Sequence, residues 1–187
     1  MAHHVPQQPG MTSHLAGQLF LHFVREQLKV DAPFFIDLLR SLSAQSETSN
    51  DPDYQYIATT LDQLADEFKR YEHRQLTKDE ANKPNLELSE TDFAELVRML
   101  LGPESDQHLS DQIVVMFFYF YDFMMRMAIK GTPRMDEVLQ WSQQAFSQHL
   151  DAKVDAAGGW RAVLKTPKTG FLSSITRFFS FGTRRKN

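Results

Sequence analysis

The segment Ile113–Ile129 is apolar almost all the way round a helix. A helix that lacks a polar face must be enclosed by other helices. Asp122 and Arg126 interrupt the run before it reaches the roughly 18 consecutive apolar residues that a membrane span requires. The pattern therefore predicts a soluble bundle built round one buried central helix, which begins near Ser110 and ends at Gly131.

Other stretches carry apolar residues at helical spacing and predict the helices that surround the central one. These stretches cover approximately residues 13–28, 54–74, 89–101 and 135–150, with a shorter apolar stretch at 34–42. Ser89 followed by Asp92 resembles a capping box, while residues 78–88 form a polar stretch. Gly158–Gly159 breaks the chain again, before a short turn at Trp160. Because no strand-like alternation stands out, the predicted fold class is all-α.

The chain divides into a body and two tails. Its 187 residues, 42% of them hydrophobic, suffice for one sizeable core. We expect a disordered tail at 1–11, a helical bundle at 12–165 and a basic amphipathic tail at 166–187. No acidic residue follows Asp155, so a basic end is attached to an acidic body.

A basic tail of this kind predicts a polyanionic partner. The alternative is a solvated tail that lies loosely on its own acidic body. Few Lys and Arg residues stand between the tail phenylalanines, whereas a segment that follows a phosphate backbone needs more of them. We therefore expect a membrane surface and no nucleic acid.

Signatures of catalysis are missing from the sequence. There is no cysteine, which excludes disulfides, thiolate metal sites and cysteine nucleophiles. Glycine-rich phosphate loops, serine-nucleophile elbows and the zinc-binding pair of histidines are also missing. We expect no enzyme, no metal and no cofactor. The first residues lack the pattern of a secretory signal, which predicts a cytoplasmic protein.

One predicted helix carries an apolar stripe next to an acidic residue. Four apolar positions share a helix face, and a small residue directly precedes an aspartate: Ile57, Leu61, Leu64, Ala65, Asp66 and Phe68. This segment resembles the Bcl-homology-three (BH3) motif of the B-cell-lymphoma-2 (Bcl-2) family. The central helix looks like that of Bax- and Bak-like members, and Trp141 falls where their next helix carries a tryptophan. Gly158-Gly159-Trp160 resembles the Bcl-homology-two (BH2) signature.

The sequence departs from the family at the start of the central helix. The family's Asn-Trp-Gly-Arg, part of the Bcl-homology-one (BH1) region, aligns with residues 109–112. Asp111 and Gln112 therefore occupy the positions of its Gly and Arg. The arginine that pairs with the aspartate of an incoming helix is thus replaced by a neutral donor, and Asp111 adds repulsion. Arg98 and Arg126 are the candidates to substitute for it.

The resemblance implies a Bcl-2-like bundle with a hydrophobic surface groove that binds helices. It implies a regulator of apoptosis, Bax- or Bak-like and pro-apoptotic, whose partners are family proteins, BH3-type helices or a second copy at the outer mitochondrial membrane. The alternatives are a pro-survival protein that sequesters such helices and a helical adaptor without groove function. In the tail, five apolar residues at helical spacing predict an interfacial or groove-docking helix: Phe171, Leu172, Ile175, Phe178 and Phe179.

Overall fold

Helices surround one central helix in the computed structural model, which describes residues 15–35, 37, 40, 52–70, 74–102, 109–131 and 135–165. Every regular element in these ranges is helical, which confirms the all-α class. In chain order the elements are α1 (Leu15–Asp31), α3 (Pro52–Lys69), α4 (Arg74–Ala81), α5 (Glu90–Leu101), α6 (Leu109–Ile129), α7 (Met135–Ala145), a π-helical turn (Phe146–Leu150), α8 (Asp151–Ala156) and α9 (Trp160–Lys165).

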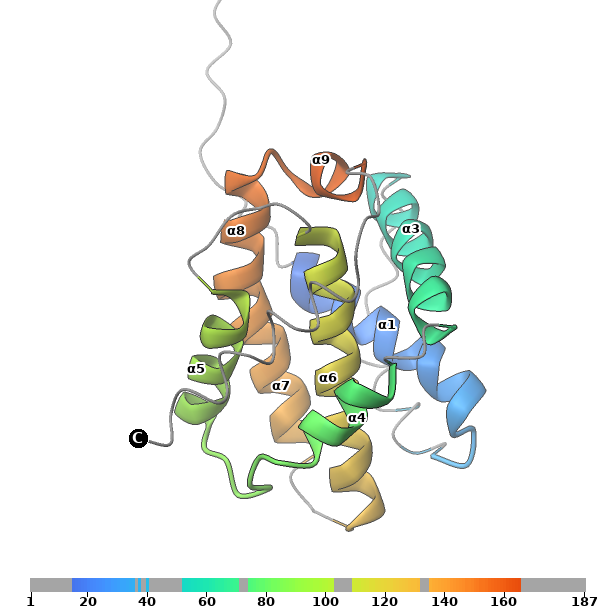
Figure 1. Ribbon diagram of the computed structural model, residues 1–187, viewed down its shortest axis with the longest axis vertical. Coiled ribbons are helices and arrows are strands. Elements are labelled where there is room, and N and C mark those ends of the chain that lie inside the picture. Colours follow the sequence, from blue (N-terminus) through green and yellow to red (C-terminus); the bar gives the residue numbers. More distant parts are fainter. Residues whose placement is uncertain are drawn as a thin grey trace, which may run out of the picture.

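Helix α6 is the predicted central helix, and its enclosure is confirmed. In Figure 1 it stands in the middle of the molecule, and it contacts α1, α3, α4, α7 and α9. Phe117 is fully buried, with its ring 5.2 Å from Phe20 of α1 and 5.4 Å from Phe146. Edge and tilted contacts of this kind stabilise a core beyond simple area burial.

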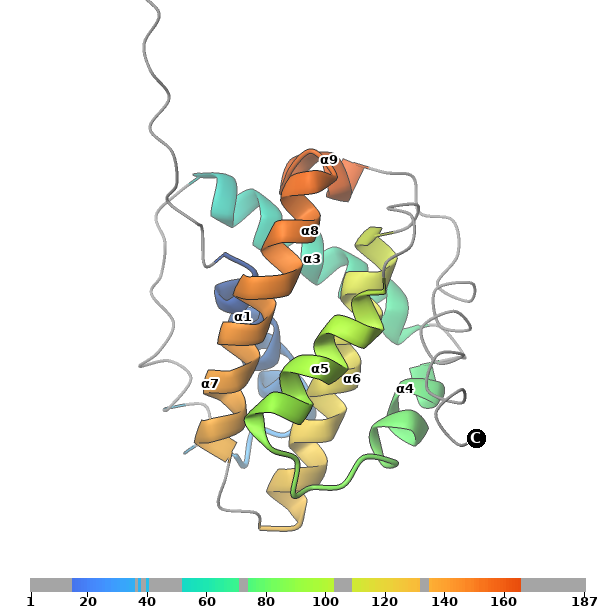
Figure 2. The same cartoon turned by 90° about the vertical axis from the view of Figure 1, so that its left-hand side faces the viewer.

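The other helices form the walls. In Figure 1, α3 lies to the right of α6, α5, α7 and α8 lie to its left, and α1 runs behind it. Figure 2 shows α1 and α7 together on the left, with α5 in front of α6. Helix α1 contacts α3, α6 and α7. Helix α9 crosses the upper end, and α4 lies against the lower half of α6. The C-terminal ends of α1 and α6 lie at the same lower end in both views.

Helices α1 and α7 approach each other closely at Gly17. A Cβ atom at this position would lie 2.8 Å from the carbonyl oxygen of Gln143 and 3.0 Å from its Cα. Because these are backbone atoms, no side-chain movement relieves the clash. Glycine is therefore required for the spacing of the two helices.

Several helix ends were predicted correctly from the sequence. The capping box at Ser89 and Asp92 is present, and α6 and α7 begin within a few residues of the predicted positions. Helix α4 was missed: its first residue, Arg74, was placed at the end of the preceding helix, and residues 78–81 were assigned to a polar stretch. The predicted turn at Trp160 is a short helix, α9.

The apolar length of α6 was also underestimated. Among the described helices, α6 alone is long and apolar enough to cross a membrane, despite Asp122 and Arg126. However, 67% of its most apolar window is buried inside the protein. That burial is typical of the core helix of a bundle.

Candidate functional site

The apolar stripe of α3 faces the interior. Ile57, Leu61, Leu64 and Phe68 are at most 3% exposed, and Ala65 is fully buried. The Phe68 ring lies 5.1 Å from that of Phe118 on the central helix. The stripe is thus part of the core in this structure, where α3 also contacts α1 and α9.

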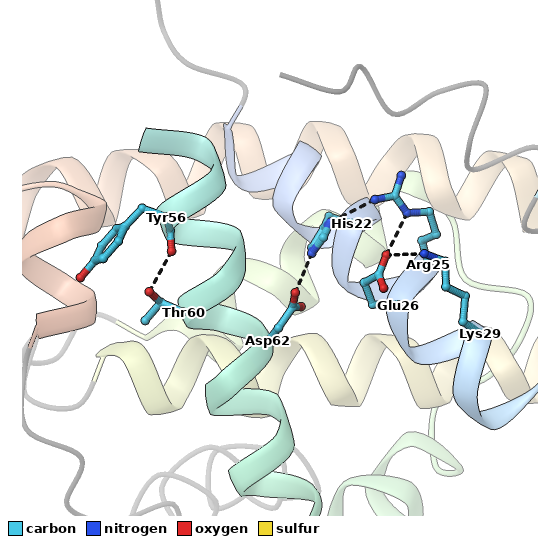
Figure 3. A network of polar contacts seen from close by, with 7 residues as sticks. All are labelled: His22, Arg25, Glu26, Lys29, Tyr56, Thr60 and Asp62. Carbon is cyan, nitrogen blue, oxygen red and sulfur yellow. Dashed lines mark hydrogen bonds and ion pairs between the residues drawn. The ribbon is translucent and has the colours of Figure 1, made fainter. Parts of the chain in front are cut away.

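The outer face of α3 is polar and is fastened to α1. Figure 3 shows His22 of α1 pointing toward Asp62 of α3, with Nε2 and Oδ2 3.0 Å apart. On the other side of the ring, an Arg25 guanidinium nitrogen lies 3.2 Å from His22 Nδ1. Arg25 also donates to Glu26 on the same helix. This contact, the His22–Asp62 clasp, joins the two helices at the edge of the solvent.

A second polar contact fastens the N-terminal end of α3 to α9. Arg161 donates to Asp53 from Nε at 2.9 Å and from a terminal nitrogen. Its guanidinium also lies over the ring of Tyr56, 4.7 Å from the centroid. Both partners of the ion pair are exposed, and such pairs contribute little to stability. Burial of the stripe therefore supplies most of the free energy that holds α3.

Asp66 lies beside the stripe and is exposed. Within the described part of the chain, no cation lies within ion-pairing distance of its carboxylate. Its neighbour Ala65 allows close approach on the buried side. Ala65 therefore faces the core, and Asp66 faces the solvent.

Gln112 contacts the end of a neighbouring helix. Its side-chain amide donates to the carbonyl oxygens of Leu100 and Leu101, at 2.9 and 3.2 Å. Lys153 of α8 donates to Leu101 and Gly102, at 2.5 and 3.1 Å. Two side chains from other helices thereby satisfy carbonyls that the last turn of α5 leaves unpaired.

Asp111, Arg98 and Arg126 are the other residues that bear on the missing family arginine. Asp111 is 1% exposed in the first turn of α6, where the helix dipole favours a negative charge. Arg98 is exposed and lies 3.9 Å from Glu95 on its own helix. Arg126 is 14 residues along α6 from Gln112, about 21 Å at the helical rise. Arg126 is therefore too far away to substitute for the family's arginine at residue 112.

Gly158 and Gly159 form the tight turn that the sequence predicts. Both have positive φ, 97° and 92°, which favours glycine. Trp160 is buried, and its indole donates to Asp151 Oδ1 at 3.2 Å. The same buried carboxylate accepts the backbone N–H of Ala16 at the start of α1, at 3.1 and 3.2 Å. Trp160 thus closes the core and links the last helix to the first.

The polar cluster between α4 and α6 was missed by the sequence analysis. Arg74 donates two hydrogen bonds to Asp122 of α6, at 2.5 and 2.7 Å, and Thr77 donates to the same carboxylate at 3.0 Å. The Arg74 guanidinium lies 4.2 Å from the ring centroid of Phe118. Both charged side chains are nearly buried. The charged residues inside the apolar run at 113–129 were the available signal, because buried charges require partners.

Two further contacts belong to this lower end of α6. The Tyr121 hydroxyl donates to Asp31 at the end of α1, at 3.1 Å. Burial and the Asp31 carboxylate raise the pKa of Tyr121 well above its usual value. Arg126 donates to the carbonyl oxygens of Ala81 and Pro84.

The predicted tail helix, with Phe171 and Ile175 among its apolar residues, lies outside the described residues, as does the tail at 1–11. No protein-family model, curated protein or solved structure matches the chain.

Proposed function

We propose that this protein is a Bcl-2-like regulator of apoptosis that acts by helix-in-groove contacts at the outer mitochondrial membrane, in the manner of the pro-apoptotic Bax- and Bak-like members. The observation that carries the proposal is the arrangement of α3. Its stripe packs on an apolar central helix, while its outer face makes polar contacts with α1 and α9. An amphipathic helix stored in this way has the form that a hydrophobic groove recognises once the helix is released.

Release of α3 requires an apolar acceptor. Each large side chain of the stripe contributes about 1.5–3 kcal/mol through burial, so exposure of four of them to water is strongly unfavourable. The two polar contacts on the outer face contribute far less. Hence α3 leaves the bundle only where the groove of a second copy or a bilayer takes up its stripe.

The second candidate is a helical adaptor that kept the bundle and lost groove chemistry. Gln112 favours this alternative, because its amide is already used on the carbonyls of α5. A further alternative is a pro-survival role, in which the protein binds foreign helices in its groove and keeps its own α3 in place.

A peptide of residues 52–69 separates these functions. Within the protein, Leu61→Glu would place a charge in the core and unfold the bundle. In a peptide the same substitution changes recognition alone. We would titrate the peptide into the full chain by calorimetry and measure dye release from vesicles that contain cardiolipin. The matched control peptide carries Gln63→Glu, the same added charge on the exposed face of the helix.

For an effector, the native and Gln63→Glu peptides bind and increase dye release, while the Leu61→Glu peptide does neither. Binding without release indicates the pro-survival function. Equal weak binding of all three peptides contradicts helix-in-groove recognition and leaves the adaptor.

A further inference from the structure

An open cavity of about 800 Å³ lies at the lower end of the bundle. Its walls come from the last turns of α1 and α3, from α4 and from the C-terminal turns of α6. This volume is within the range of small-ligand sites, roughly 300–1,000 Å³. The cavity is separate from the stripe of α3, which is closed within the core.

The charges that line the cavity are unbalanced. Five cationic residues line it, against the two carboxylates of Asp31 and Asp122. Asp122 is paired with Arg74, while Asp31 accepts from the neutral Tyr121 hydroxyl and keeps its charge. Arg126 donates to a backbone carbonyl, so three lysines remain opposite one carboxylate.

Those remaining cations are lysines from three different helices. Lys69 ends α3, Lys78 lies in the last turn of α4 and Lys130 follows α6 directly. No carboxylate within the described ranges pairs with any of them. Three lysines from separate helix ends that line one cavity raise the positive potential there and favour an anion.

Apolar side chains lie next to this cationic wall. Ile129, on the rim, is 74% exposed, and Met125 lines the interior. Val30 and Phe34, at the end of α1, are 72% and 73% exposed. The ends of α1 and α6 share the lower end of the bundle (Figures 1 and 2). A cationic cavity with an exposed apolar residue in its lining, and further exposed apolar residues at the same end of the bundle, is typical of a surface that meets both headgroups and acyl chains.

We propose that this cavity binds the phosphate headgroup of an anionic phospholipid, with Lys69, Lys78 and Lys130 around the phosphate. Ile129 then enters the boundary between headgroups and acyl chains. The site docks the lower end of the bundle on a membrane independently of the C-terminal tail. It goes beyond the function proposed above and does not require α3 to move.

The test is the sedimentation of the full chain with vesicles of phosphatidylcholine containing phosphatidylglycerol. The site variant is Lys69→Gln/Lys78→Gln/Lys130→Gln. The control variant is Lys29→Gln/Arg98→Gln/Lys165→Gln, which removes three cations that are also in last turns of helices but do not line the cavity. Thermal melts establish that both variants are folded.

We expect the site variant to partition on the order of 100-fold more weakly onto anionic vesicles, since each lysine near such a surface contributes about 1 kcal/mol, or about fivefold. The control variant should change a few-fold at most. Equal losses in both variants would mean diffuse attraction rather than a site, and no loss in either would place membrane binding elsewhere. Both results overturn the proposal.

A second measurement distinguishes a lipid from a free phosphate ester. Ile129→Ser should weaken vesicle binding several-fold and leave the binding of soluble glycerophosphate, measured by calorimetry, unchanged. If the site variant loses glycerophosphate binding while Ile129→Ser leaves vesicle binding intact, the ligand is a soluble ester and the lipid assignment is wrong.

Discussion

Helices α3 and α4 both pack on the central helix, α3 through apolar side chains and α4 through charge. The stripe of α3 is buried along most of the helix. In α4 only Thr77 and Ala81 are buried, and the Arg74–Asp122 pair attaches the helix to α6. Apolar contacts tolerate any partner of suitable shape, whereas a bidentate ion pair accepts one geometry. We therefore expect α3 to accept a different apolar partner more readily than α4.

The largest loss of stability is expected from a substitution in the apolar core around α6. Phe117→Ala removes a fully buried ring that contacts α1 and the π-helical turn, and should cost about 3–5 kcal/mol of unfolding free energy. Chemical denaturation measures it. Ile129→Ala on the same helix is the control and should change stability by about 0.5 kcal/mol or less, since Ile129 is exposed. Similar losses in both variants would contradict the enclosure of α6.

The ion pair between α4 and α6 should respond differently to single and double substitution. Asp122→Ala leaves Arg74 nearly buried without its partner, and should cost about 3 kcal/mol. The double variant Arg74→Met/Asp122→Leu replaces both charges by apolar groups and should recover most of that loss. Denaturation of the three proteins tests the expectation. A double variant no more stable than Asp122→Ala would mean that α4 depends on the charges themselves.

These two cases also show how far the sequence predicts the structure. The central helix, the capping box at Ser89 and the turn at Gly158–Gly159 follow from local pattern, because the residues that create them are neighbours in the chain. Helix α4 has no apolar stripe, and its main contact joins residues 48 positions apart. No local pattern encodes such a contact.

The same limit applies to the candidate site. The stripe of α3 was visible as a periodicity, but its burial in the protein's own core depends on α1, α6 and α9 together. Gln112 was identified by alignment with the family motif. Its acceptors, the carbonyls of Leu100 and Leu101, depend on how α5 ends, which the side chains do not reveal.

Tyr121→Phe tests the contact between α1 and α6. Loss of the hydrogen bond to Asp31 should cost about 1 kcal/mol at neutral pH. Because the pKa of Tyr121 is raised in the folded state, its contribution is complete below pH 10, the ordinary value, and is lost as pH rises above it. Denaturation at pH 8 and pH 11 should therefore show a smaller alkaline loss for the variant than for the native protein. An equal loss in both would contradict the assignment to Tyr121.

The smallest effect concerns the His22–Asp62 clasp. Asp62→Ala removes a partly exposed partner and should cost less than about 1 kcal/mol. Hydrogen exchange of α3 amides measures any local loosening, with Gln63→Ala on the exposed face as the control. A cost similar to that of Phe117→Ala would show that polar contacts, rather than the stripe, hold α3.

The buried carboxylate of Asp151 has a consequence for synthesis of the chain on the ribosome. The α1 amide that it caps lies 135 residues upstream, so at 5–20 residues per second α1 waits roughly 7–27 s for its cap. During that interval α6 also emerges before α7 and α9 cover it. We expect the nascent chain to expose an apolar helix long enough to attract a membrane or a chaperone. A stalled chain ending at residue 150 should accordingly leave α1 open to protease.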